Sequence, residues 1–238
     1  MPLSVDLRNG REVFLRRLYE EGVSVPHFMG MTRLHSTRAA PPNETHSHPH
    51  LEVHYLVRGQ QIQVLGGQTF RLTPGDVLVA HAGVPHFCGA YQARRVEYNL
   101  SVDLRGASRH FLGMHGDEAL ALRRELKDLH PFFSTDNTLY KILDRVIDQY
   151  EPKRPYTGLL GGSLVTQFLV GLVRASGMGT KPAVSAPIAC AAEIFRASAH
   201  EKITVARVAR QVGLTPSGLL PRFTREMGMG PKAFLTHE

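Results

Sequence analysis

Short runs of β-branched and aromatic residues, separated by tight-turn residues, fill the chain between residues 24 and 104. The runs lie at 24–35, 52–59, 61–67, 68–76, 77–83 and 96–104. Gly66-Gly67 predicts a hairpin turn between two of them, and Thr73-Pro74-Gly75-Asp76 predicts a turn with proline at its second position. Many short strands at close spacing predict a small antiparallel barrel or jelly roll.

The period of the apolar residues becomes helical after residue 105. A three-four spacing marks one helix face at Leu139, Ile142, Leu143, Val146 and Tyr150. A second helix, predicted over 163–177, is apolar enough to be buried on two sides. Its stripe of Leu164, Phe168 and Leu172 fits either a dimer seam or packing against the barrel.

The N-terminal residues and the cysteines bear on the cellular compartment. Residues 11–22 predict a short helix that ends at Gly22, and the chain start lacks the apolar core of a secretory signal. Cys88 and Cys190 lie far apart and fit two buried thiols in a reducing compartment. No uninterrupted apolar run is long enough to cross a bilayer. We therefore expect a cytoplasmic protein that is not associated with a membrane.

The stretch 45–59 concentrates side chains that bind metals or polar ligands. Five of them occupy alternate positions, at His46, His48, His50, Glu52 and His54. Alternate residues of an extended strand point to the same face, and Glu52 and His54 follow Pro49, so these two share a strand face. His86 follows a Gly-Val-Pro turn and would join them if its strand lay beside the first. The predicted ligand-binding residues are His46, His48, Glu52, His54 and His86.

The C-terminal segment carries the capping and turn residues of a helix-turn-helix. Thr204 is a candidate cap for a first helix, and Gly213 supplies a turn after it. Thr215 is a candidate cap for a second helix, with Pro216 at its first position. The residues predicted to face inward are Val205, Val208 and Ala209 on the first helix and Leu219 and Phe223 on the second.

A third helix precedes this pair, after a linker at 177–187 that is rich in Gly, Pro, Ser and Ala. It offers Ala189, Ala192 and Phe195 for packing. The segment 188–238 carries seven Lys or Arg against four Asp or Glu, and the whole chain has a net charge of +7. A basic balance favours a polyanionic partner, although solubility alone explains a charge of this size equally well. A generic three-helix bundle is the alternative to a DNA-binding unit.

Two motifs resemble those of the cupin family. The first, H-x-H-x(3)-E-x(6)-G, is matched at His46, His48, Glu52 and Gly59. The second is matched at Gly75, Gly83 and His86, but His81 stands where proline is usual and Ala90 where asparagine is usual. The resemblance implies a jelly-roll β-barrel for this part of the chain.

The cupin resemblance also implies a metal site. Its four positions correspond to His46, His48, Glu52 and His86, and all four are filled by metal-binding residue types. Three imidazoles and one carboxylate suit one divalent transition metal, namely Fe, Mn, Ni, Cu or Zn. The same side chains would hydrogen-bond the hydroxyl groups of a sugar without any metal.

The C-terminal segment resembles the first helix-turn-helix of the AraC/XylS family of transcription regulators. The resemblance is carried by Ala209, Gly213, Leu214, Leu219, Phe223, Gly228 and Leu235. A cupin sensor and a helical linker commonly precede this unit in that family. The stretches 46–59, 81–87 and 96–104 are most similar to the melibiose-regulator branch, whose sensors respond to sugars. The resemblance therefore implies a homodimeric DNA-binding activator that responds to a sugar or glycoside.

Two departures limit what the resemblance implies about DNA. The family has two such units joined by a long helix, and this chain ends within that helix, which predicts a C-terminal truncation without the second unit. Pro221 removes a backbone donor and should kink the recognition helix. The family's base-reading positions correspond to Ser217, Leu220 and Pro221, none of which makes bidentate base contacts. The predicted DNA-binding residues are Thr215, Ser217, Leu220, Arg222 and Arg225, the two arginines for phosphates.

Taken together, the sequence predicts an α+β protein with three parts. They are a cupin ligand sensor at 1–105, a helical linker or dimerisation region at 106–180, and a helix-turn-helix unit at 184–238. We expect a transcription regulator rather than an enzyme, with DNA and a small-molecule effector as partners. Two alternatives remain, a metal-dependent cupin enzyme such as an oxygenase or isomerase, and a sensor that acts only through dimerisation.

Overall fold

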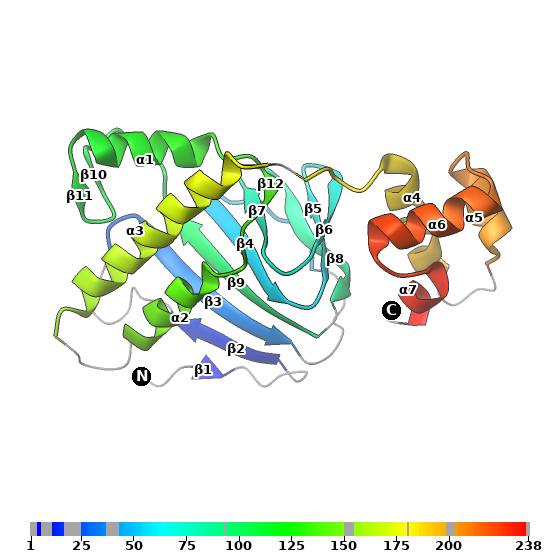
Figure 1. Ribbon diagram of the computed structural model, residues 1–238, viewed down its shortest axis with the longest axis horizontal. Coiled ribbons are helices and arrows are strands. Elements are labelled where there is room, and N and C mark those ends of the chain that lie inside the picture. Colours follow the sequence, from blue (N-terminus) through cyan, green and yellow to red (C-terminus); the bar gives the residue numbers. More distant parts are fainter. Residues whose placement is uncertain are drawn as a thin grey trace.

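The computed structural model describes residues 4–5, 11–16, 25–36, 43–92, 94–149, 155–179, 181–198 and 203–236. Within these ranges, two antiparallel sheets face each other, as expected for a jelly roll. Helices α1 to α3 lie along one side of the larger sheet, and helices α4 to α7 gather beyond the smaller sheet (Figure 1).

The larger sheet has seven strands in the order β1-β2-β3-β9-β4-β7-β12, and all neighbouring strands are antiparallel. Their bounds are Ser4–Val5 (β1), Arg11–Arg16 (β2), Phe28–Ser36 (β3), Arg95–Val102 (β9), Leu51–Arg58 (β4), Asp76–Ala80 (β7) and Phe132–Ser134 (β12). The strands predicted within 24–35, 52–59, 77–83 and 96–104 are therefore confirmed with small shifts of their ends.

The smaller sheet has three strands in the order β6-β5-β8, and a separate hairpin joins β10 to β11. Their bounds are Gln68–Leu72 (β6), Gln61–Leu65 (β5), His86–Gln92 (β8), His110–Phe111 (β10) and Met114–His115 (β11). Gly66 and Gly67 both have positive φ values, 55° and 77°, as the predicted two-residue hairpin requires. The second turn is also confirmed, because the Asp76 amide donates to the Thr73 carbonyl at 2.9 Å.

The two sides of the larger sheet have different environments because successive side chains point in opposite directions. In β4, Val53 and Tyr55 belong to the core shared with the helices, whereas Leu56 belongs to a core between the two sheets. The core between the sheets consists of Leu56, Leu65, Phe70, Leu72, Leu78, Ala80 and Phe132. Glu52 and His54 have the parity of Leu56, so they also face the interior between the sheets.

Three helices cover the outer side of the larger sheet: α1 (Asp117–Lys127), α2 (Tyr140–Gln149) and α3 (Thr157–Ser176). The predicted face of α2 is confirmed at Leu143 and Val146, which are fully buried; Tyr150 lies outside the described residues. The α3 stripe of Leu164, Phe168 and Leu172 is buried in the core shared with the sheet. Of the two interpretations of this stripe, the structure therefore supports packing against the barrel.

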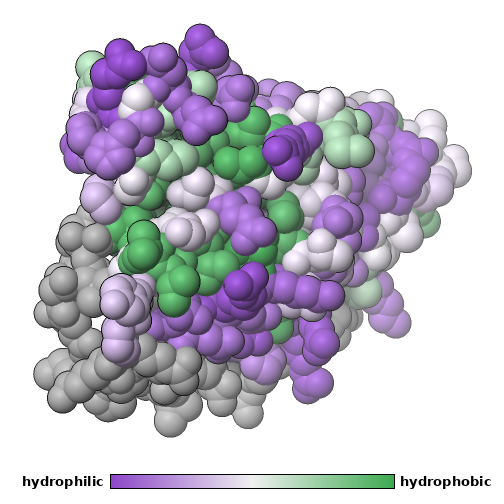
Figure 2. Space-filling model, turned by 60° about the vertical axis from the view of Figure 1, so that its left-hand side comes forward, coloured by the Kyte–Doolittle hydropathy of each residue, from purple (hydrophilic) through white to green (hydrophobic). Residues whose placement is uncertain are grey.

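α3 is the one helix among the described residues that is long and apolar enough, by length and composition alone, to cross a membrane. Polar residues interrupt every apolar run of the sequence, so a helix of this kind was not predicted. Large apolar side chains at its start, Tyr156, Leu159 and Leu160, are exposed. Figure 2, which turns the left-hand side of Figure 1 forward, shows apolar side chains gathered between polar ones. The opposite face of α3 packs into the protein core.

The sequence predicted a helix over residues 11–22. This prediction is wrong for residues 11–16, which form β2. β2 pairs with β3, with Val13 opposite Leu34 and Leu15 opposite Thr32. Pairing with a neighbouring strand satisfies the backbone donors and acceptors, and such tertiary context overrides a weak local helix propensity. Residues 17–24 lie outside the described residues.

The C-terminal helices α4 (Ala186–Ala197), α5 (Val205–Gln211), α6 (Pro216–Met227) and α7 (Pro231–Thr236) share a core of their own, which we call the helical unit. Of the predicted inward residues, Val208, Ala209, Leu219 and Phe223 are fully buried, and Val205 is partly buried against the same core. On α4, Ala192 and Phe195 are buried as predicted. Ile188 and Ala191 are the other buried residues of this helix, whereas Ala189, which was also expected in the core, is only partly buried. α6 continues through Pro221 to Met227, so the proline does not end the helix.

The segment between α3 and α4 is bound to the sheets, unlike a free linker. Lys181 forms an ion pair with the buried carboxylate of Asp76 at 2.7 Å, and the Val184 amide donates to the Thr69 carbonyl at 2.7 Å. The smaller sheet also contacts the helical unit directly. Ile62 of β5 belongs to the core of that unit, and the guanidinium of Arg71 packs on Gly228, where a Cβ would collide with it.

Candidate ligand and metal site

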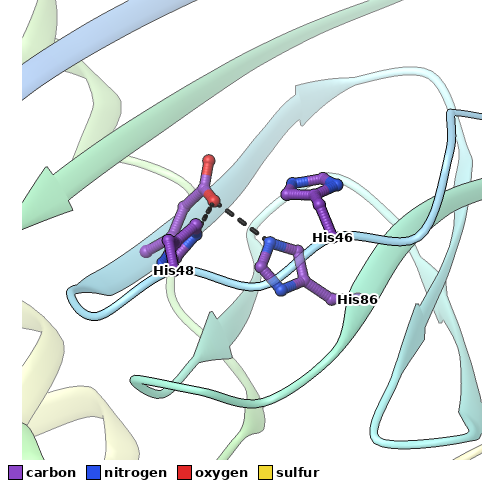
Figure 3. Close-up of side chains that lie close together, drawn as sticks. His46, His48 and His86 are labelled. Carbon is purple, nitrogen blue, oxygen red and sulfur yellow. Dashed lines mark hydrogen bonds and ion pairs between the residues drawn. The ribbon is translucent and has the colours of Figure 1, made fainter.

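Backbone pairing brings the two histidine-containing segments together. His46 and His86 form an isolated antiparallel bridge, in which each backbone amide donates to the other residue's carbonyl, at 3.1 Å and 2.9 Å. Glu52 reaches the same place from β4, on the opposite sheet. Figure 3 shows the rings of His46, His48 and His86 around one carboxylate. The sequence motif therefore predicted correctly which residues would meet.

Each of the three imidazoles is oriented by its Nδ1 atom. Nδ1 of His46 donates to the Glu44 carbonyl at 3.0 Å, and Nδ1 of His48 donates to the His50 carbonyl at 3.0 Å. Nδ1 of His86 donates to the Val84 carbonyl at 2.9 Å. A proton fixed on Nδ1 leaves Nε2 as the atom that can bind a metal, and such backbone partners are the usual support of metal-binding histidines.

The Glu52 carboxylate is the centre of the cluster. Its Oε2 atom lies 2.6 Å from Nε2 of His48 and 3.2 Å from Nε2 of His86. Burial would raise the pKa of Glu52, but the nearby His54 and the hydrogen bonds from His86 and His48 outweigh it and hold the pKa well below its usual range. Burial also opposes the charged form of His86, yet its hydrogen bond to Glu52 raises its pKa overall. The carboxylate therefore stays ionised.

The four side chains fit a transition-metal ion. One ligand atom from each of His46, His48, Glu52 and His86 lies within 4.8 Å of the others. Three neutral imidazoles and one carboxylate form a donor set suited to Fe, Mn, Ni, Cu or Zn. With an ion bound, the Nε2 atoms of His48 and His86, which lie beside the Glu52 carboxylate in this structure, would bind the ion instead.

Two other histidines of the motif have supporting roles. The ring of His50 stacks on that of His48, with centroids 3.7 Å apart and planes 2° apart. Burial and the neighbouring His48 lower the pKa of His50. His81, which stands where the cupin motif has proline, hydrogen-bonds through Nε2 to the Leu129 carbonyl at 2.9 Å. His81 thus ties the end of β7 to the chain after α1.

The described cluster lies within a segment that matches a known family model. Residues 33–169, more than half of the chain, match the AraC-like ligand binding domain. The chain belongs to this family. The match runs from within β3 to within α3, so it includes the smaller sheet, the larger sheet apart from β1, β2 and the start of β3, and most of the helices that cover the larger sheet. The cupin-type fold expected from the histidine motifs is thereby confirmed.

Solved structures similar to this chain carry several different descriptions. KdgF from Halomonas sp. is 24% identical over 42% of this chain and 86% of its own, with a TM-score of 0.33. The AraC-like transcriptional activator CuxR is 12% identical over 96% of this chain and 84% of its own, with a TM-score of 0.41. A predicted oxalate decarboxylase from Thermotoga maritima is 15% identical over 39% and 84%, with a TM-score of 0.33. The chain matches no curated protein sequence.

Inside the AraC-like ligand binding domain, polar side chains continue from Glu52 into the space between the sheets. His54 lies next to Glu52, with Nε2 3.9 Å from Oε1, and its Nδ1 lies 3.5 Å from Nε2 of Gln63 on the facing sheet. Further polar side chains extend this line on β5 and β9. We call the set the interior polar network, and it consists of His54, Gln61, Gln63, Arg95, Glu97 and Asn99.

Five members of the interior polar network were missed by the sequence analysis, which identified only His54. A signal for them exists, because Gln61 and Gln63 alternate with apolar residues on one strand. Arg95, Glu97 and Asn99 alternate in the same way on another. Alternating polar residues usually mark a solvent-exposed sheet face, and only the pairing of the strands shows that this face is enclosed.

The five predicted DNA-binding residues lie at the start and along one side of α6. Thr215 accepts a hydrogen bond from the Gly218 amide at 3.1 Å, as a helix cap does. Ser217 and Arg225 are exposed, and Leu220 is 43% exposed. Arg222 is half-buried and pairs with Glu226 at 2.9 Å. The structure thus leaves four of the five side chains at the surface, while Arg222 is partly neutralised by Glu226. The same Glu226 oxygen lies 3.6 Å from Nη2 of the exposed Arg225.

Proposed function

We propose that the protein is a ligand-responsive transcription regulator. In this proposal, the AraC-like ligand binding domain senses a small molecule, and the helical unit binds DNA. One observation above all supports it: Gln63 of β5 faces His54 in the interior, while the adjacent Ile62 lies in the core of the helical unit. A movement of β5 caused by a ligand at its interior face would therefore displace a residue that packs against the helical unit.

The helices α5 and α6 have the features of a helix-turn-helix. Thr204 and Thr215 cap them, with Oγ1 accepting from Arg207 N at 3.3 Å and from Gly218 N at 3.1 Å. Gly213 makes the turn between them with φ at 69°, a conformation that favours glycine. The exposed side of α6 is the proposed recognition surface, with Thr215, Ser217, Leu220, Arg222 and Arg225 as its DNA contacts.

The effector proposed for the sensor is a sugar or glycoside. Glu52, His54 and the three metal-site histidines would line one end of its site, where Glu52 and His48 are about one-sixth exposed. When a divalent transition metal is bound by His46, His48, Glu52 and His86, it supplies a Lewis-acidic anchor for ligand oxygens. The Nδ1 hydrogen bonds of the histidines would hold the rings in place in either case.

The proposal also assigns roles to the three parts of the chain. Residues 1–105 and 106–180 act together as sensor and dimerisation region of a cytoplasmic homodimer, and 184–238 is the output unit. Residues on both sides of position 105 share one core. The exposed apolar side chains Tyr156, Leu159 and Leu160 at the start of α3 are available to a second copy of the chain.

DNA selection from a random duplex pool tests this proposal, with affinities measured by fluorescence anisotropy over a range of salt concentrations. Arg225→Ala should weaken binding and reduce the salt slope by about one phosphate contact. Arg145→Ala is the control, because it makes the same charge change on the exposed side of α2. It should leave the DNA affinity and the salt slope unchanged. If neither selected nor random DNA is bound, or if the two variants behave alike, the regulator proposal fails. Turnover of a sugar by the same preparation would favour an enzyme instead.

A further inference from the structure

The interior polar network contains polar atoms that no protein group satisfies. Within the network, five buried atoms lack a hydrogen-bond partner among the described residues: Nε2 of His54, Oε1 of Gln61, Oε1 of Gln63, Nη1 of Arg95 and Oδ1 of Asn99. Four of the side chains are no more than 7% exposed. Buried polar atoms are nearly always paired in folded proteins, because an unpaired one has lost its water without compensation. Five in one place point to a binding partner that is itself polar.

These atoms belong to one contiguous region. His54 and Asn99 are direct cross-strand partners on β4 and β9, on the face that looks toward the smaller sheet. Gln63 reaches His54 from that smaller sheet, and Asn99 donates to Glu97 at 3.3 Å. Gln61 donates to Cys88, which is the cross-strand partner of Gln63. The unpaired atoms therefore line both sides of the same interior, next to the Glu52 cluster.

The charge within this region is already balanced. Nε of Arg95 donates to Glu97 at 2.8 Å, and the two side chains are only 2% and 3% exposed. A buried pair of this kind leaves no net charge for an anionic ligand to neutralise. A ligand carboxylate placed beside this pair, away from the Glu52 cluster, would face Glu97 without a cation of its own.

The unpaired donors and acceptors of the network determine which polar groups a ligand must carry. The three amide oxygens require donors, whereas Nη1 of Arg95 requires an acceptor. A carboxylate cannot donate, but a hydroxyl group donates and accepts. Hydroxyls also suit either orientation of the Gln61 and Gln63 amides, because each orientation leaves one end of the amide unpaired.

We propose that the interior polar network is a binding subsite for a neutral polyhydroxylated molecule, and that the Arg95–Glu97 pair excludes its anionic analogues. The inference rests on the proposed sensing role of the interior and is independent of DNA binding. It adds to the histidine cluster a second set of ligand-contacting residues on β5 and β9. Ligand hydroxyls satisfy Gln61, Gln63 and Asn99, and the ion pair determines specificity.

The first part of the test is the stability of the unliganded protein. Gln63→Leu and Asn99→Leu each remove one unpaired buried oxygen together with one long hydrogen bond, to His54 at 3.5 Å and to Glu97 at 3.3 Å respectively, with little change in volume. The two effects oppose each other, so the melting temperature should change little. Tyr55→Phe is the matched control on β4, because the Tyr55 hydroxyl is hydrogen-bonded to Thr135 at 2.9 Å. This variant loses a satisfied hydrogen bond and should melt at a lower temperature.

The second part is calorimetric titration of the full chain with neutral and anionic probes. The neutral probes are D-glucose, D-galactose, D-xylose and myo-inositol, and the anionic ones are D-glucuronate and D-galacturonate. At least one neutral probe should bind, and Gln63→Leu and Asn99→Leu should each weaken it by about tenfold or more, while Tyr55→Phe should not. Glu97→Gln leaves Arg95 without its counter-ion and should shift the preference toward the uronates.

Three results would overturn the inference. The uronates could bind the unaltered protein more tightly than the neutral sugars. Gln63→Leu and Asn99→Leu could leave carbohydrate binding unchanged. All probes could fail to bind while both leucine variants melt as low as Tyr55→Phe, which would give the network a purely structural role. Failure of DNA binding, by contrast, would remove the proposed regulator function and leave these affinities and melting temperatures as they are.

Discussion

Ile62 and Gln63 are adjacent residues of β5 whose side chains lie on opposite faces of the strand. Nε2 of Gln63 is 3.5 Å from Nδ1 of His54 in the interior, and Gln63 is 1% exposed. Ile62 is 5% exposed and is the one cupin residue in the described core of the helical unit. One strand therefore forms a wall of the proposed sensing site and a contact surface for the helical unit.

The four-residue metal site leads to a prediction for His48. His48→Ala should reduce bound transition metal from about one equivalent per chain to near zero, because each ligand contributes heavily to such a site. Elemental analysis of the purified protein measures this directly. His50→Ala is the matched control, since its ring only stacks on His48. Equal metal contents in the two variants would rule out this ligand set.

Arg123 is predicted to be the main anchor of the β10–β11 hairpin. It is 3% exposed and donates to three carbonyls, those of Gly106, Ser108 and His110. Arg123→Met keeps most of the side-chain volume but leaves these acceptors unpaired, so it should lower the free energy of unfolding by about 2–4 kcal/mol. Arg124→Met is the control, on the exposed side of the same helix. Chemical denaturation would contradict the assignment if the two variants were equally stable.

The two cysteines should differ sharply in reactivity. Burial, helped by the nearby Glu97 charge, raises the pKa of Cys88 to about 12. Cys190 is exposed on α4, so the buried thiol expected there from the sequence is wrong. The thiolate is the reactive form, and it is populated only as the pH approaches the pKa, so at about pH 8 the Cys88 thiol stays protonated. Mass spectrometry after brief maleimide treatment should find one label, on Cys190. Rapid labelling of both residues in the folded protein would show that the interior is open.

Much of the fold could be predicted because local residue types determined it. The glycines at 66 and 67 specified a hairpin, and Thr204, Gly213 and Thr215 specified the ends of two helices. The histidine motif predicted which residues would meet at Glu52. These features depend on short-range conformation or on spacing, which a sequence displays directly.

Other features depended on partners far away in the chain and could not be predicted. Residues 11–16 form a strand only because β3 lies beside them. Gln61, Gln63 and Asn99 resemble solvent-facing strand residues until the second sheet encloses them. The burial of Leu164, Phe168 and Leu172 against the sheet required tertiary structure to distinguish it from a dimer seam.

The most direct measurement of the central claim is the DNA affinity of Ile62→Ala. Loss of this contact should make the position of the helical unit relative to β5 less fixed. DNA binding would then have to fix that position, which costs part of the binding free energy. Couplings of this kind amount to about 0.5–2 kcal/mol, so affinity for a selected duplex should fall severalfold. Val64→Ala, on the same face of β5 but outside the core of the helical unit, is the control. A severalfold loss in Ile62→Ala alone is the predicted result, and unchanged affinity in both variants would contradict the coupling of sensor to DNA.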